Sequence, residues 1–270
     1  MYQRDFPLRG RRARRRVGGW GAVLLSLTAP AWAADGPVTL VASSDARPGI
    51  AAMPQIAAPA DEAERRINAA LKRLDARALK AEQACRAQGG KNSSWERSVQ
   101  APMRGPRFLS YVISDSWFCG GAHPSSNTMS IVYDLTTGAP VDWTTLLPAS
   151  LTGKLALAEG PGGTKMVTLA SGKLHALYLA GYRPKTGDPK ADDADKECRE
   201  AVAETYDGQP PAMMAWLDAK AGGLAVQFDL AHVVQACADP VVIPVAALRR
   251  EGAQPLLAVA LEAAHARAPK

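Results

Sequence analysis

The amino-acid sequence predicts the α+β class, with antiparallel sheet meanders packed against helices and held by two disulfides. Three observations support this class. Residues 61–87 carry one apolar stripe at helical spacing, and residues 107–147 contain the alternating pattern of paired strands. The chain also contains four well-separated cysteines. Together these features predict a single domain over residues 61–270.

The N-terminus has the pattern of a secretory signal peptide. Residues 1–16 hold seven arginines, and the apolar run that follows ends in Ala31-Trp32-Ala33. This pattern predicts a signal peptide over residues 1–33. A membrane anchor is the alternative, but the run is too short and glycine-rich to span about 30 Å of hydrocarbon. The flanking residues favour general secretion over twin-arginine export, so we expect a periplasmic or secreted protein with no membrane span after cleavage.

The positive charge of the chain belongs to this N-terminal segment. The whole sequence has 32 basic and 26 acidic residues, and removing the segment's seven arginines and one aspartate leaves 25 of each. A neutral remainder offers no basic surface for phosphates. We therefore expect no nucleic-acid partner.

Residues 34–60 differ in composition from the rest of the chain. They are rich in alanine and proline and carry little charge. This composition is typical of an extended linker, so the segment is predicted to be a linker or mobile stretch ahead of the domain.

The clearest helix is expected over residues 61–87. Asp61 can cap its N-terminus, with Glu64 three residues on as the second member of a capping box. The apolar stripe recurs every three or four residues and consists of Ile67, Leu71, Leu74, Ala78, Ala81 and Cys85. The pair Gly89-Gly90 ends the helix.

Strands are expected next. Residues 107–118 are rich in aromatic and β-branched side chains, and residues 128–135 alternate apolar with polar ones. The turn Thr137-Gly138 follows, and residues 139–147 return as a short strand that runs into a helical turn. Residues 107–147 are therefore predicted to form an antiparallel meander.

The C-terminal half predicts further helices. One is expected over 164–181, although Gly172 would destabilise this helix by about 1 kcal/mol relative to alanine. Another is expected over 192–206, which begins with aspartates. Pro244 opens a final helical stretch.

A hairpin is predicted between these helices, over residues 213–230. Its turn falls at Gly222-Gly223. The side chains expected to face inward are Trp216, Leu224, Val226 and Phe228. A short turn or helix over 231–237 leads to the last strand-like segment.

The cysteines indicate disulfides. An even number of separated cysteines in an exported protein is typical of a disulfide framework, and four cysteines allow three connectivities. We favour Cys85–Cys119 with Cys198–Cys237, the pairing that closes the shorter loops. Each bridge would stabilise the fold by about 3–4 kcal/mol.

The stretch WFCGGAHPSSN, residues 117–127, allows three interpretations. Cys119 and His123, joined by Cys198 or Cys237, could bind zinc, but oxidised cysteines argue against it. A hydrolase could use His123 with Ser114 or Ser125, although no Gly-x-Ser-x-Gly elbow is present. We assign no catalytic residue, metal ligand or cofactor on these grounds.

The third interpretation is structural. Gly120 and Gly121 permit positive φ after a strand, and Pro124 stiffens the exit. His123 can then hold the loop between two strands by hydrogen bonding to its backbone. Cys119 can tether the strand end to the helix that carries Cys85.

This region also carries a resemblance. The segment CGGAHPSSNTMSIVYDLTTGAPVDWTTLL resembles a bacterial extracytoplasmic domain family of unknown function, through Gly-Gly-Ala-His, the Asp134-Leu135 strand end with its Thr137-Gly138 turn, and Asp142 to Leu146. The segment VQFDLAHVVQACADPVVIPVAAL is similar to the family's C-terminal pattern, with Leu230 or Ala231 where a tyrosine is usual. The family's domain occurs in lysozyme-sensing anti-sigma factors and beside some peptidoglycan deacetylase domains.

The resemblance implies a role in the cell envelope. It implies a non-catalytic binding protein for a peptidoglycan fragment or a lysozyme-type muramidase, without deacetylase activity. The candidate binding residues are Trp117, Gly120, Gly121, His123 and Trp143. The alternative from another class is a cell-wall hydrolase or esterase that uses His123.

Overall fold

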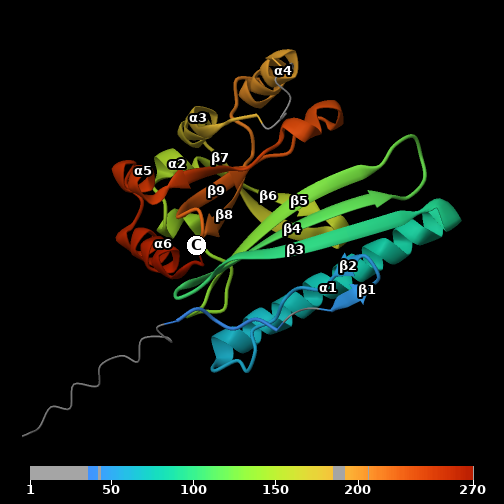
Figure 1. Cartoon of the computed structure of the whole chain (residues 1–270), viewed down its shortest axis with the longest axis horizontal. Helices are drawn as coiled ribbons and strands as arrows, with labels where there is room; N and C mark the ends of the chain where they lie inside the picture. Colours follow the sequence, from blue (N-terminus) through green and yellow to red (C-terminus); the bar gives the residue numbers. More distant parts are fainter. Residues whose placement is uncertain (1–35, 42–43, 185–191, 206, 270) are drawn as a thin grey trace, which may run out of the picture. The chain divides into compact units, whose positions relative to one another are not determined.

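The fold is of the predicted α+β class, in a computed structural model that describes residues 36–41, 44–184, 192–205 and 207–269. Figure 1 shows a large sheet flanked by a long helix, together with shorter strands and helices. The strands form three sheets with the orders β1-β2-β3-β4-β5, β10-β9-β8 and β6-β7. The predicted signal peptide lies outside the described residues.

Helix α1, Glu62–Gly89, confirms the clearest helix of the sequence. The Asp61 side chain accepts a hydrogen bond from the Glu64 N–H, so Asp61 caps the helix as expected. The Glu64 carboxylate accepts from the Ala60 N–H, one residue before the N–H that a capping box would use. Ile67 and Leu71 are fully buried against the five-stranded sheet. Figure 1 shows α1 running along this sheet.

The large sheet carries the predicted strands and one that was missed. Strands β4, Phe108–Phe118, and β5, Ser125–Asp134, pair antiparallel as predicted. Strand β3, Ser94–Arg104, pairs antiparallel with β4 on its other side and was not anticipated. Trp95, Val99 and Met103 do alternate with polar residues along it, but the charged Arg97 interrupts this apolar series. Pro102 also argued against a strand, because proline cannot donate to a ladder of hydrogen bonds.

The segment predicted as a linker, 34–60, packs against the domain in its described part. It contains the short strands β1, Asp45–Arg47, and β2, Ile50–Ala51, and β2 pairs parallel with β3. Met53 and Ile56 are buried, and their N–H groups donate to side chains of α1, Asp75 and Asn68. The composition suggested a linker because alanine and proline dominate it, but apolar side chains three residues apart anchor it.

A second sheet packs against the first. It consists of β8, Met214–Asp218, β9, Gly223–Gln227, and β10, Val241–Pro244. The predicted hairpin is confirmed as β8–β9, and its four predicted inward side chains are buried. Two serines of the large sheet join the sheets, since Ser110 accepts from the Leu217 N–H and Ser130 donates to the Ala215 carbonyl.

The prediction of a helix over 164–181 is wrong for the first half of that range. Residues 154–170 form a hairpin of β6, Lys154–Gly160, and β7, Thr164–Ala170, and only α3, Gly172–Gly181, is helical. Apolar side chains at 166 and 169 matched helical spacing, but the turn before Thr164 and the β-branched residues after it favour strands. Ser171 caps α3 by accepting from the Leu174 N–H.

The remaining helices are short. They are α2, Ala149–Thr152; α4, Asp192–Ala203; α5, Val245–Arg250; and α6, Pro255–Arg267. The helical turns predicted after Asp142 and over 231–237 are 3-10 helices, Trp143–Thr145 and His232–Cys237. Within the described chain, no helix has the length and apolar content that crossing a membrane requires.

Both predicted disulfides are confirmed. Cys85–Cys119 joins the last turns of α1 to the end of β4, and Cys198–Cys237 joins α4 to the 3-10 helix His232–Cys237. Since all four cysteines are oxidised, the zinc interpretation that needed their thiolates does not hold. Two disulfides fit a protein that folds outside the reducing cytoplasm.

Candidate functional site

The motif loop, residues 119–124, connects β4 to β5 at the outer end of the large sheet. Gly120 and Gly121 have φ angles of 87° and 116°, the positive values for which the sequence selects glycine. The disulfide of Cys119 fixes the start of the loop. His123 is exposed, and its Nδ1 lies 3.4 Å from the Pro124 carbonyl oxygen.

Trp117 belongs to an aromatic pair at the base of this loop. Its ring stacks on Trp95 of β3, with centroids 5.2 Å apart and an interplanar angle of 17°. The Trp95 Nε1 donates to Asp115 at 3.0 Å. Side chains alternate along a strand, so the pair shares the α1-facing side of the sheet with the buried Asp115.

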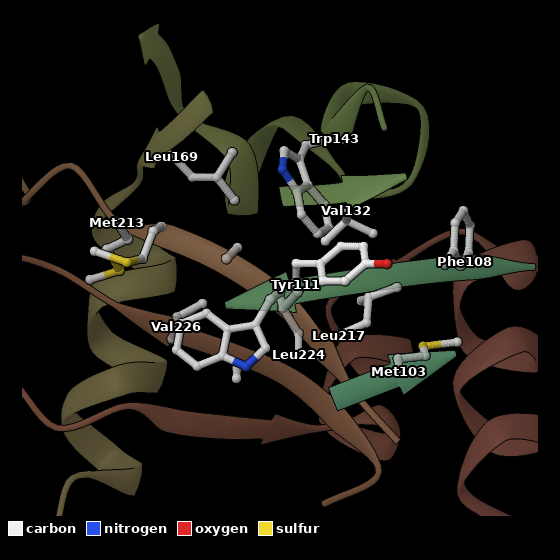
Figure 2. Packing of buried hydrophobic residues seen from close by; sticks show 14 of the residues in the cluster. Met103, Phe108, Tyr111, Val132, Trp143, Leu169, Met213, Leu217, Leu224 and Val226 are labelled. Atoms are coloured by element: carbon white, nitrogen blue, oxygen red, sulfur yellow. The ribbon is translucent and has the colours of Figure 1, made fainter. Parts of the chain in front are cut away.

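Trp143 lies far from the loop. It is 4% exposed, and Figure 2 shows it next to Val132 in the core. Trp117 pairs with Ser125, seven residues along β5 from Val132, which corresponds to roughly 24 Å. The structure therefore keeps Trp117, Gly120, Gly121 and His123 at one end of the sheet and separates Trp143 from them.

A hollow of about 480 Å³ lies beside the motif loop, across β3, β4 and β5. Its polar side chains form two rows in register: Glu96, Ser116 and Ser126 in one, and Ser98, Ser114 and Thr128 in the other. We call these six residues the hydroxyl trough. All are at least partly exposed, and the short serine side chains leave the concave surface open.

A buried charge cluster lies beneath the trough, on the α1 side of the sheet. Arg97 is 6% exposed, and its guanidinium lies 3.9 Å from Asp75 of α1. Burial raises the pKa of Asp75 and of Asp115, and lowers the pKa of Arg97. The Arg97–Asp75 ion pair links the sheet to α1, and strand alternation places the hydroxyls of the trough on the opposite face of the sheet.

Sequence reasoning identified the loop but missed the trough. The missing part was β3, which supplies Glu96 and Ser98. The available signal was the alternation of small polar residues in β4, at Ser114 and Ser116, which marks a face that the core does not cover.

Strand geometry separates Ser114 from His123, the first pair that a hydrolase interpretation would need. Ser114 lies three residues along β4 from Trp117, roughly 10 Å from the base of the loop. Proton transfer between a nucleophile and a base requires contact at hydrogen-bond distance, about 3 Å. Ser125 is nearer in sequence and partly buried, and the loop that it adjoins is exposed on the surface.

Similar solved structures come from bacteria. One is a DUF3298 family member from Bacteroides fragilis, with a TM-score of 0.41 and 14% identity over 72% of this chain and 66% of that chain. Another is a DUF3298 family protein from Pseudomonas aeruginosa, with a TM-score of 0.33 and 18% identity over 60% of this chain. The chain thus spans 66% and 64% of the length of these two structures. No protein-family profile and no curated protein matches the chain.

Proposed function

We propose that this protein is a non-catalytic binding protein of the bacterial cell envelope, exported to the periplasm or secreted. Its ligand is a peptidoglycan fragment, or a lysozyme-type muramidase that acts on peptidoglycan. The observation that carries the proposal is the hydroxyl trough, an open polar surface beside the loop whose sequence resembles the envelope domain family.

The trough suits a glycan fragment. Sugars and their N-acetyl groups offer hydroxyls, carbonyls and N–H groups, and serine and threonine hydroxyls can both donate to and accept from them. Glu96 adds an acceptor at the outer row. The two rows are held by regular antiparallel pairing, so the hydroxyls are positioned before a ligand arrives.

Charge supports recognition by local hydrogen bonds. The chain after residue 33 carries equal numbers of acidic and basic residues. Long-range attraction is therefore weak, and affinity depends on how well the polar groups of ligand and trough pair. Since each good hydrogen bond contributes about 1 kcal/mol net, we expect binding that is modest and insensitive to salt.

Calorimetry of the purified protein against disaccharide-peptide muropeptides and a panel of lysozymes tests the proposal. We expect saturable binding of a muropeptide to the wild-type protein. Each of the variants Ser114→Arg and Thr128→Arg should bind it at least tenfold more weakly, because the arginine side chain fills the trough. Ala246→Arg on α5 is the control, since it adds the same side chain at an exposed position elsewhere.

Two results would contradict the proposal. No binding of any muropeptide or lysozyme at high micromolar concentration would remove the envelope ligand. Binding that survives both trough variants would place the ligand elsewhere on the molecule. Binding of a lysozyme alone, lost in the trough variants, would select the muramidase over the glycan.

A further inference from the structure

A second hollow, of about 370 Å³, lies between α1, the outer edge of β5 and the β6–β7 hairpin. Trp143 forms part of its wall, so we call it the Trp143 groove. It shares no lining residue with the hydroxyl trough. It is therefore a separate site from the one proposed above.

The floor of the groove is apolar. It is made by Leu74 of α1, Val132 and Tyr133 of β5, Met166 of β7 and Trp143. Leu157 of β6 stands at the rim and is 65% exposed. An exposed leucine beside an apolar hollow increases the area that a ligand can cover.

The rim carries three cations. Arg73 and Arg77 project from successive turns of α1, and Lys165 comes from β7. In the part of the chain that the structure describes, none of the three forms an ion pair, although Glu159 lies opposite Lys165 in the hairpin register. Arg77 donates only a long hydrogen bond, 3.4 Å, to the Gly163 carbonyl.

The charge of the rim extends into the groove. Burial raises the pKa of Tyr133 to about 12, and the nearby positive charge of Arg73 acts against this rise. The other three arginines of α1 are balanced locally, because Arg65 and Arg66 pair with Glu62 and Arg86 pairs with Glu82. The groove is thus the place on this helix where cations face a hollow without a carboxylate partner in contact.

We propose that the Trp143 groove binds a small amphiphilic carboxylate, with its apolar body on the floor and its head on the rim. Arginine holds a carboxylate through two parallel N–H bonds, and a second cation one helical turn away adds attraction. A hollow of this volume holds about a dozen heavy atoms, at the lower end of the range of small-molecule sites. The ligand is a free small molecule of this size.

Decanoate and decanol provide matched probes, since they share the apolar chain and differ in the charged head. Titration into the purified protein is followed by tryptophan fluorescence and by calorimetry. We expect decanoate to bind saturably and decanol to bind at least tenfold more weakly. Trp143→Phe should remove the fluorescence change and leave calorimetric binding within a fewfold of wild type.

Charge variants identify the rim. Arg73→Gln with Arg77→Gln should weaken decanoate at least tenfold and leave decanol unchanged, and Lys165→Gln should weaken decanoate independently. Lys72→Gln with Lys80→Gln is the control, because it removes the same charge from exposed positions on α1 outside the groove.

Several outcomes would overturn the proposal. Equal affinity for decanoate and decanol would show that the cations of the rim play no part in binding. Equal losses of decanoate affinity in the rim and control variants would show that only the total positive charge of the protein matters. A fluorescence change that persists in Trp143→Phe would place the probe elsewhere. Binding to phosphatidylglycerol vesicles without binding of decanoate would assign the surface to a membrane instead.

Discussion

Gly89 shows how a single residue sets the geometry of the motif loop. A Cβ added at this position would lie 2.7 Å from the carbonyl carbon of Cys119 and 2.9 Å from its oxygen. The backbone would have to move, so Gly89→Ala should destabilise the fold by about 1–3 kcal/mol and lower the melting temperature by several degrees. Gly172→Ala, at the first turn of α3 with open space around it, should be neutral or stabilising by up to about 1 kcal/mol. Equal melting temperatures of both variants would contradict the close approach.

The buried carboxyls predict a pH effect at the same scale. Burial raises the pKa of Asp115 and Asp75 in the folded state, so the native protein holds protons on them above pH 3.8, where the unfolded chain has lost them. Their contribution to stability is therefore greatest at low pH and is lost as pH rises through the folded pKa values. The free energy of unfolding of wild type minus that of Asp115→Asn should increase as pH falls from about 6 to 4. A flat difference would show that the pKa of Asp115 is unchanged by folding, and a difference that decreases on acidification would show that its pKa is lowered; either result contradicts the prediction.

The roles of some residues could be predicted from the sequence, and those of others could not. Capping by Asp61 and positive φ at Gly120 and Gly121 depend on local chemistry, which the sequence displays. The pairing of Arg97 with Asp75 depends on packing between segments that are distant in sequence. Trp143 was a candidate binding residue because it flanks the motif in sequence. Its neighbour Val132 lies seven residues along β5 from the Ser125 that pairs with Trp117, so Trp143 lies in the core and not beside the loop.

At the scale of elements, each disulfide joins one helix to a neighbouring segment. The bridges span 34 and 39 residues, so the chain-entropy estimate gives about 4 kcal/mol for each. The double variant Cys85→Ser with Cys119→Ser should lower the free energy of unfolding by about that amount in urea titrations, and the Cys198→Ser with Cys237→Ser variant should do the same. The unfolded, unreduced wild-type protein should contain no titratable thiol, and two titratable thiols would contradict the pairing.

Elements were predictable where one face is apolar and the other is not. Helix α1 and strand β5 have that contrast and were identified close to their observed bounds. Strand β3 has one polar face in the trough, and the charged Arg97 interrupts the apolar residues of its inner face, so its alternation was not recognised. The β6–β7 hairpin was missed because most of β6 is exposed, and β7 has apolar residues at a spacing that also suits a helix.

For the whole molecule, the domain begins before α1. Met53 and Ile56 are 1% and 4% exposed, so Met53→Ala and Ile56→Ala should each cost about 2–5 kcal/mol of stability. Val41→Ala is the control, since Val41 is 52% exposed and its truncation should change stability by less than about 1 kcal/mol. Thermal unfolding of the three variants measures this difference, and unaltered melting of the first two would restore the linker interpretation.

The candidate site can be recognised only in the folded molecule, because its residues come from segments that are distant in the sequence. The fold class and the disulfides could be predicted from patterns within segments. The trough depends on the register of three strands, and the groove depends on α1 lying beside the β6–β7 hairpin, which follows much later in the chain. Sequence patterns do not encode such long-range contacts directly, because many chain paths satisfy the same local preferences.

The connectivity of the disulfides has a consequence for how the chain matures. The loops closed by the two bridges, 85–119 and 198–237, follow one another along the sequence without nesting or crossing. A chain that emerges from a pore with its N-terminus first presents Cys119 to Cys85 while the other two cysteines are still inside. An oxidant that joins each cysteine to the one before it thus forms the native pairs in order, and no disulfide has to be reshuffled afterwards. For the exported protein proposed above, maturation should therefore require a thiol oxidase but no isomerase, and the yield of correctly paired protein should be the same in cells with and without a disulfide isomerase.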